Sequence, residues 1–235
     1  GCGRFLFVTA TDTAPLCGAH RNAGIRRYFA IALNNEYHAE TGLRILLGFI
    51  AREAARYDRG IEPLFSYARE HYCRVHLRLL RGARMADRSL SMMGYVLQCP
   101  SCIFRTHTTG ILPSHEECPY CRNALVPVGP LWTGPLHDRN LLDRLHESIS
   151  SSGFRLGGEL RKLVDTCRNE LDIPHHYDYH GLARYFHISP PPIDDVIHSL
   201  RSRGYEASRA HFSGTAVKTI APHSVLREAL TRNRS

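Results

Sequence analysis

Four cysteines constrain the fold of this chain more than any other feature. They form two C-x-x-C pairs, Cys99 with Cys102 and Cys118 with Cys121, with fifteen residues between the pairs. Each pair encloses a proline in a turn-like segment, so two tight loops can direct four thiolates at one point about 2.3 Å from each sulfur. This spacing is typical of a tetrahedral zinc site built from two facing knuckles. The sequence therefore predicts a zinc ribbon.

The alternative interpretation of these cysteines is disulfides or ordinary buried thiols. Disulfides belong to oxidising compartments, whereas no secretory segment opens the printed sequence and the remaining cysteines are scattered. Zinc is the better interpretation. Four thiolates complete the coordination shell, so we expect a structural metal. A catalytic zinc would need a position for water, which would require His107 or His115 to displace a thiolate.

Composition indicates an anionic partner. Lys and Arg number 30 against 22 Asp and Glu, which gives a formal net charge of +8 at pH 7 with 15 histidines in addition. Nucleic acid is the first expectation for such a surface. The longest apolar runs, such as residues 5–8 and 45–50, are far shorter than the roughly 20 residues of a membrane span. We expect a cytoplasmic protein that does not contact membrane.

Residues 1–97 predict an α/β region. Residues 3–11 form a short apolar run that suits a strand buried on both faces in a parallel sheet. Since a strand is already under way at Arg4, we expect the natural protein to continue upstream. Residues 37–57 predict an amphipathic helix, with Arg44 off its apolar stripe. Residues 71–80 alternate like a strand with one solvated face and are expected to pair with residues 90–97 in a hairpin.

The remainder predicts two further parts. Residues 98–135 hold the cysteine ribbon and a Gly/Pro-rich connector with the single tryptophan. Residues 136–235 predict an α+β domain in which helices precede a hairpin. Its expected helices cover residues 141–145, 156–171, 179–186 and 193–203, and its hairpin strands cover 205–212 and 215–220. This order resembles a winged helix.

The turn after the first strand is a candidate substrate pocket. Thr9, Thr11 and Asp12 stand at the strand's carboxyl end, which is where open α/β sheets place their ligands. The alternative is that Asp12 caps a helix and the threonines satisfy backbone groups. The sequence contains neither G-x-G-x-x-G nor a phosphate loop, so the usual nucleotide-binding glycines are absent.

Positive charge is concentrated in two segments. Six arginines stand against two acidic residues within residues 69–88, and seven basic residues against two acidic ones from residue 199 onward. Such patches suit phosphate contacts, although a solvated surface is the common alternative. The candidate contacts with nucleic acid are Arg74, Arg78, Arg209, His211 and Lys218.

Several stretches together resemble the archaeal-type tRNA (guanine-26-N2) dimethyltransferase family in its carboxyl-terminal part. They include FVTATDTAPLCG at residues 7–18 and GPLW at residues 129–132. The remaining stretches are residues 35–46, 70–72 with Arg74, 208–213 and 217–219. The resemblance implies the tail of a class I methyltransferase sheet, a zinc-containing segment and a tRNA-binding domain. It also implies methyl transfer from S-adenosylmethionine to N2 of guanine-26.

The same resemblance places the family's Asp-Pro-Phe-Gly motif and cofactor-binding strands upstream of Gly1. No catalytic residue is therefore expected in this chain, and S-adenosylmethionine should be bound mainly by the upstream half. The chain alone is expected to be inactive. The alternative is a non-catalytic module in which a zinc ribbon and a winged helix bind nucleic acid. Mono- or dimethylation, the choice of tRNA and the oligomeric state stay open.

Overall fold

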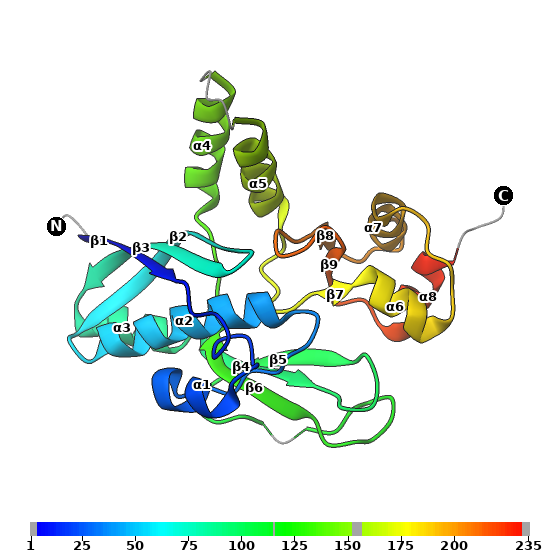
Figure 1. The fold of residues 1–235 in the computed structure, drawn as a ribbon, viewed down its shortest axis with the longest axis horizontal. Helices are drawn as coiled ribbons and strands as arrows, with labels where there is room; N and C mark the ends of the chain where they lie inside the picture. The colour runs from blue at the N-terminus through cyan, green and yellow to red at the C-terminus, as the bar shows by residue number, and fades with distance from the viewer. Residues whose placement is uncertain (1–3, 115, 152–156, 232–235) are drawn as a thin grey trace.

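The computed structural model describes residues 4–114, 116–151 and 157–231. Within these ranges the strands form three antiparallel sheets of three strands each, and helices pack around and between them (Figure 1). No described helix is long and apolar enough to cross a membrane.

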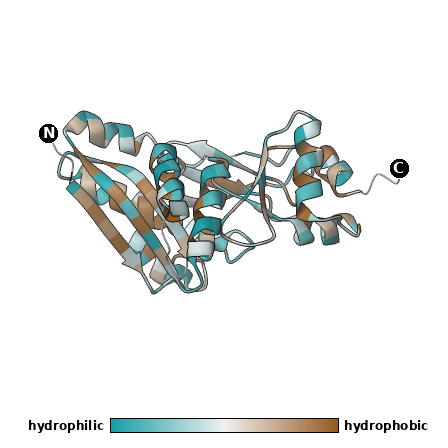
Figure 2. Cartoon of the chain, turned by 90° about the horizontal axis from the view of Figure 1, so that it is seen from above, coloured by the Kyte–Doolittle hydropathy of each residue, from teal (hydrophilic) through white to brown (hydrophobic). Residues whose placement is uncertain are grey.

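The first sheet consists of β1 (Arg4–Ala10), β2 (Arg59–Arg69) and β3 (Tyr72–Arg81) in the order β1-β3-β2. Its middle strand confirms the strand predicted for residues 71–80. Cys73, Val75 and Leu77 are buried and alternate with more exposed polar residues, as a strand with one covered face requires. Figure 2 shows hydrophobic and hydrophilic residues alternating along these strands.

Two expectations for this region are wrong. β1 is an antiparallel edge strand, and Phe5 and Phe7 are 59% and 68% exposed, so it is not a strand buried in a parallel sheet. An apolar run reads the same in both situations, and its sequence cannot say whether a neighbour covers it. The expected hairpin is also absent, because α3 (Ala83–Leu90) follows β3 and directs the next strand into another sheet.

The second sheet consists of β4 (Met93–Gln98), β5 (Arg105–Thr109) and β6 (Val126–Trp132) in the order β5-β4-β6. Helix α2 (His38–Ala55) contacts both this sheet and the first one, so most of its residues are buried. It confirms the helix predicted over residues 37–57. However, Arg44 is fully buried rather than off the apolar stripe.

The C-terminal part begins with α4 (Arg139–Ser151) and α5 (Gly157–Asn169), which pack side by side and project from the molecule (Figure 1). The third sheet follows, with β7 (Tyr177–Asp178), β8 (Ala207–Arg209) and β9 (Ala216–Thr219) in the order β7-β9-β8.

Three helices complete this part: α6 (Tyr179–Phe186), α7 (Ile193–Ser202) and α8 (His223–Leu230). The predicted helices over residues 179–186 and 193–203 and the pairing of the two hairpin strands are confirmed. The sequence did not predict β7 or α8. The description as a winged helix stays a prediction.

Gly94 provides a test of the packing around β4. A Cβ atom on Gly94 would lie 2.0 Å from the carbonyl oxygen of Thr108 in the neighbouring strand, whereas one on Gly158 would meet nothing within 4 Å. We expect Gly94→Ala to lower the free energy of unfolding by about 1–3 kcal/mol, since the backbone must shift to admit the methyl group. Gly158→Ala should leave it unchanged or slightly raise it. Urea unfolding of the two variants measures the difference, and equal stabilities would contradict this account.

Candidate metal centre and cationic surfaces

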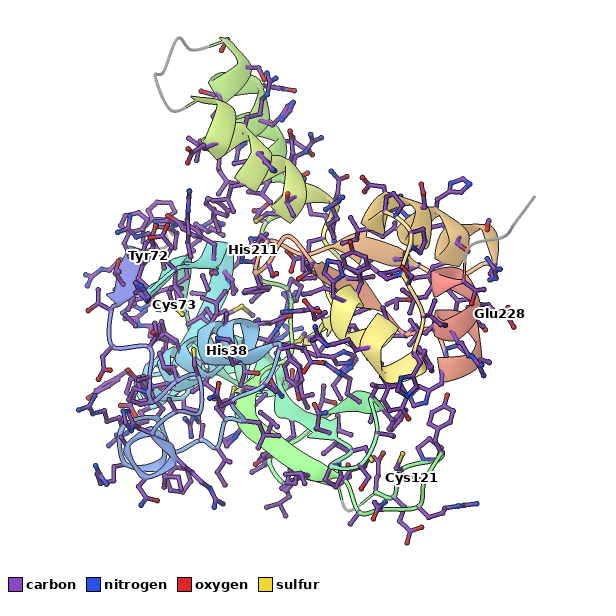
Figure 3. All side chains as sticks on the ribbon, turned by 45° about the vertical axis from the view of Figure 1, so that its right-hand side comes forward. His38, Tyr72, Cys73, Cys121, His211 and Glu228 are labelled. Atoms are coloured by element: carbon purple, nitrogen blue, oxygen red, sulfur yellow. The ribbon has the colours of Figure 1, made fainter. Side chains whose placement is uncertain are left out.

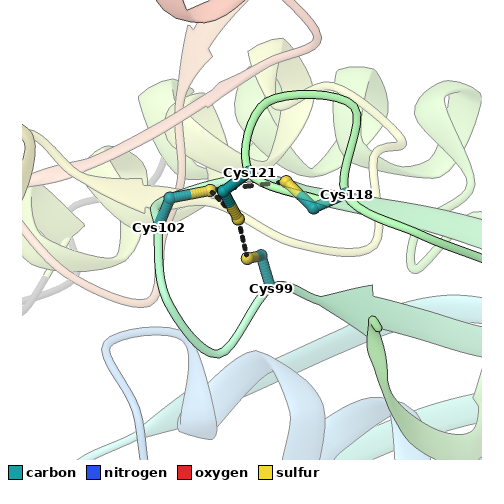
Figure 4. A group of neighbouring side chains, drawn as sticks. All are labelled: Cys99, Cys102, Cys118 and Cys121. Atoms are coloured by element: carbon teal, nitrogen blue, oxygen red, sulfur yellow. Dashed lines mark hydrogen bonds between the residues drawn. The ribbon is translucent and has the colours of Figure 1, made fainter. Parts of the chain in front are cut away.

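The four cysteines of the two C-x-x-C pairs converge on one point (Figure 4). Sγ of Cys99 lies 3.3 Å from Sγ of Cys121, and Sγ of Cys102 lies 3.5 Å from Sγ of Cys118 and 4.0 Å from Sγ of Cys121. A tetrahedral zinc with bonds of about 2.3 Å separates its sulfurs by roughly 3.8 Å. The four sulfurs therefore have the spacing that such an ion requires.

The two loops that carry these cysteines repeat one local geometry. The amide of Cys99 donates to the carbonyl of Phe104 at 2.9 Å, and the amide of Cys118 donates to the carbonyl of Asn123 at 2.9 Å. Further donors point at the sulfurs, including the amide of Ser101 toward Cys99 at 3.4 Å. Such donors stabilise thiolates, so both loops are arranged to hold anionic sulfur.

The surroundings of the cysteines shift the pKa values of their thiols, and they also show whether a histidine can join the four sulfurs as a ligand. Hydrogen bonds from Asn123 lower the pKa of Cys121 to about 6, whereas burial raises the pKa of Cys99. His107 does not belong to the cluster, and its ring packs near that of His175 at 5.9 Å between centroids. His115 lies outside the described residues. The site therefore offers four sulfurs, which fits a structural rather than a hydrolytic zinc.

Aromatic and charged side chains of the cysteine loops and β5 contact the C-terminal part of the chain. Tyr120, between two of the cysteines, stacks on His223 at the start of α8 with 3.7 Å between ring centroids. Arg105 of β5 is buried, donates to the carbonyl of His176 at 2.7 Å and forms an ion pair with Glu36. The cysteine loops and β5 thus contact the C-terminal part of the chain.

The candidate pocket residues Thr9, Thr11 and Asp12 lie exposed at the end of β1. Arg74, the register partner of Thr9 on β3, donates to the Thr9 hydroxyl at 3.2 Å. Asp12 forms an exposed ion pair with Arg27 and does not cap a helix, because α1 (Arg21–Tyr28) begins nine residues later and follows His20. The helix-cap interpretation is therefore wrong.

Lys218, expected on the surface as a tRNA contact, is fully buried. Its Nζ lies 2.6 Å from Oε1 of Glu40 in α2 and 2.8 Å from Oε1 of Glu170 after α5. The His211 side chain is also buried, and its Nδ1 lies 2.6 Å from Oε2 of Glu170. Neither side chain can reach a phosphate in this fold. The sequence pattern was misleading because the sequence around Lys218 does not show that its ion-pair partners, Glu40 and Glu170, lie far away along the chain.

Glu40 is the centre of this buried network. Its carboxylate accepts from Nε of Arg44 at 2.9 Å and lies 2.8 Å from Nδ1 of His176. Burial alone would raise the pKa of Glu40, but Lys218, Arg44 and His176 together hold it well below its usual range. The same balance, with Lys218 first among the opposing groups, lowers the pKa of Glu170. Sequence analysis missed both carboxylates, although an acidic residue on the apolar side of a predicted helix was a signal.

The remaining predicted tRNA contacts are on the surface. Arg74 is exposed, Arg78 pairs with Glu62 at 3.0 Å, and Arg209 pairs with Asp194 at 2.9 Å. Arg209 also lines a surface pocket of about 390 Å³. Two other basic residues line this pocket: Arg69, which belongs to the basic segment 69–88 but was not a predicted contact, and Lys162, which the sequence did not single out. Basic side chains from β2, α5 and β8 therefore meet at one hollow, where Arg69 pairs with Glu159 at 3.0 Å.

Comparison with known proteins identifies the family of this chain. The family model described as "N2,N2-dimethylguanosine tRNA methyltransferase" matches residues 2–231. The chain belongs to this family. The dimethylguanosine tRNA methyltransferase resemblance read from the sequence is thereby confirmed.

Two curated relatives described as tRNA (guanine(26)-N(2))-dimethyltransferase are close in sequence. That of Methanoculleus marisnigri is 56% identical over 97% of this chain and 62% of its own length, and that of Methanoregula boonei is 52% identical over 98% and 62%. A solved structure, Trm1 from Pyrococcus horikoshii in complex with S-adenosyl-L-methionine, is 40% identical with a TM-score of 0.87. It is matched over 98% of this chain and 60% of that chain. The chain thus spans about three fifths of the length of the relatives it matches.

The cysteine cluster predicts the metal content of a variant. Cys118→Ser should remove one equivalent of tightly bound zinc per chain, because a hydroxyl does not replace a thiolate ligand. Zinc content by mass spectrometry, with Cys73→Ser as the control, measures this loss. Cys73 is equally buried but lies on β3, outside the cluster. An unchanged zinc content in Cys118→Ser would contradict the ligand assignment.

The buried network predicts a large loss of stability in Lys218→Met. Removing the ammonium leaves Glu40 and Glu170 buried without their shared cation, which should cost about 3–5 kcal/mol in urea unfolding at pH 7. Arg56→Ala, which breaks an exposed pair with Glu53, should cost less than about 1 kcal/mol. Similar losses in the two variants would show that the network contributes little.

The same network predicts how stability depends on pH. The ordinary pKa of both carboxylates is 4.5, and their folded-state pKa lies below it, so their contribution is complete above pH 4.5. It is lost as the pH falls below that value, because the unfolded chain then binds protons that the folded chain does not. The wild type should therefore lose stability steeply below pH 4.5, and Glu40→Gln should lose it less steeply. Parallel pH profiles would contradict this assignment.

Proposed function

We propose that this chain is part of an enzyme that transfers methyl groups from S-adenosylmethionine to N2 of guanine-26 in tRNA, giving N2-methyl- and N2,N2-dimethylguanosine. The family match over residues 2–231 carries this proposal. High identity to the named relatives and a similar fold in a protein solved with S-adenosyl-L-methionine support it. The family match also makes a purely non-catalytic binding module the weaker alternative.

The first sheet supports a division of functions between this chain and the portion of the relatives that it does not span. β1 pairs only with β3 among the described residues, and its other edge and the rings of Phe5 and Phe7 are exposed. That edge is suited to accept a further strand of the methyltransferase sheet. We assign S-adenosylmethionine binding and the catalytic group to the portion of the relatives that this chain does not span, and we propose that the chain alone is inactive.

Within the complete enzyme, the residues at the end of β1 would form one wall of the substrate pocket. S-adenosylmethionine, when bound, supplies an electrophilic methyl group that leaves its sulfur for the N2 lone pair. Thr9 and Thr11 offer hydroxyls, and Asp12 a carboxylate, that can orient the guanine edge and accept hydrogen bonds from its amine. Arg74 fixes the Thr9 hydroxyl and is placed to contact the phosphate of an extruded nucleotide.

The zinc ribbon and the surface hollow would hold the tRNA body in register. A zinc bound by the four cysteines would fix the loop that packs on α8, without taking part in the chemistry. Arg78, Arg209, Arg69 and Lys162 provide cationic groups for backbone phosphates. We propose this surface in place of Lys218 and His211.

A chimeric enzyme tests the proposed function. The portion of the Methanoculleus marisnigri relative that this chain does not span would be joined to this chain and assayed with unmodified tRNA and labelled S-adenosylmethionine. We expect methyl transfer to N2 of guanine-26 by the chimera and none by this chain alone. A tRNA with adenine at position 26 is the control. A chimera that folds and binds tRNA but transfers no methyl group would contradict the proposal.

Salt dependence tests the phosphate contact proposed for Arg74. Arg74→Ala should weaken tRNA binding and reduce the slope of log K against log salt by about 0.7–0.9, since one phosphate contact is lost. Arg56→Ala removes an equally exposed arginine at the end of α2 and should leave the slope unchanged. The chimera is used for both variants. Equal slopes in the two variants would move the tRNA surface elsewhere.

A further inference from the structure

A second group of metal-ligating side chains lies where the first sheet, the α4–α5 pair and the third sheet meet. It consists of His137, Cys167, Glu170 and His211, and one ligand atom from each lies within 4.8 Å of all the others. Figure 3 labels His211 at this junction. The group is separate in sequence and in space from the four cysteines of the ribbon.

The fold brings this group together from three separate segments. His137 follows the connector and forms a bridge to Phe65 of β2. Cys167 lies in the last turn of α5, and Glu170 follows that helix directly. His211 follows β8. Cys167 and Glu170 are only 1% and 3% exposed, so the site is interior.

The hydrogen bonds of the described residues leave ring nitrogens at this point without partners. Both nitrogens of His137 and Nε2 of His211 are buried and have no partner there. A buried polar atom without a partner costs about 1–3 kcal/mol, and such atoms are uncommon in native proteins. Three of them beside one buried thiol indicate that a group is bound between them.

The contacts of Nδ1 of His211 indicate that Nε2 is the nitrogen available to bind a metal. Its Nδ1 lies 2.6 Å from Oε2 of Glu170, and its backbone amide donates to the same oxygen at 3.0 Å. A carboxylate accepts only, so Nδ1 is the donor to Glu170, and Nε2 is the ring nitrogen left to coordinate a metal. A histidine held in this way by a carboxylate is the common arrangement around metal ions.

We propose that His137, Cys167 and His211 bind one zinc ion and that Glu170 orients His211 from outside the coordination shell. Two imidazoles and one thiolate suit zinc, which prefers nitrogen and sulfur ligands. Binding releases the thiol proton of Cys167 to solvent. A fourth position is left for water or for a further ligand.

Charge and access are compatible with this site. Both ring nitrogens of His137 are buried and have no partner among the described residues, so either one is free to coordinate. The nearest fixed cation, Lys218, is balanced by Glu40 and Glu170. His137 borders a pocket of about 250 Å³, and His211 borders the pocket of about 390 Å³.

Metal content tests the proposal. After dialysis against zinc and then against zinc-free buffer, the wild-type chain should hold two zinc ions, one in the ribbon and one here. Cys167→Ser should hold one, and Cys73→Ser, which removes another buried thiol, should hold two. One zinc per wild-type chain would overturn the proposal, as would two zinc ions in Cys167→Ser.

A measurement without substitutions covers the case in which Cys167→Ser fails to fold. Diffraction data are collected from crystals of the wild-type chain above and below the zinc absorption edge. The anomalous difference map should show a peak between His137, Cys167 and His211 only above the edge. A second peak is expected among the ribbon cysteines and is the internal control. A ribbon peak without a peak at the histidines would overturn the proposal.

Discussion

The arrangement of the whole chain depends on the sharing of one buried lysine between two carboxylates. Glu40 comes from the helix between the first two sheets, Glu170 from the end of the projecting helix pair, and Lys218 from the last sheet. Each of these charges is offset by groups from other segments, and Arg44 and His176 also lie next to Glu40, as His211 does next to Glu170. Separating the C-terminal part from α2 would leave buried charges without Lys218 or its carboxylates, a penalty that a hydrophobic contact of similar area does not carry.

Two buried arginines connect further segments of the chain around this network. Arg44 donates to the carbonyls of Trp132 and Gly134 at 3.0 and 2.9 Å, which ties the connector to α2. Arg105 ties the cysteine ribbon to residue 176 of the C-terminal part. Arginine suits both positions because its planar group satisfies several fixed acceptors at once. The result is a frame on which β1 and the basic hollow hold fixed positions relative to each other.

The sequence predicted the features that local spacing encodes. The cysteine cluster, helix α2 and the β8–β9 pairing follow from patterns within short windows, and the structure confirms their geometry. Features set by distant partners were not predicted. Burial of Lys218 depends on a carboxylate 178 positions away, and β1 looks like a core strand because an apolar run does not show which side is covered. The pocket and tRNA residues remain proposals, since their partners are other molecules.

The free edge of β1 has a consequence for handling the chain. Among the described residues no strand pairs with its outer edge, and the rings of Phe5 and Phe7 beside that edge are exposed, so an extended peptide can pair there. Natural proteins usually blunt such edges with charge, proline or a covering helix. Until another strand occupies it, two copies can join there side by side, so at high concentration the preparation should tend toward self-association and precipitation.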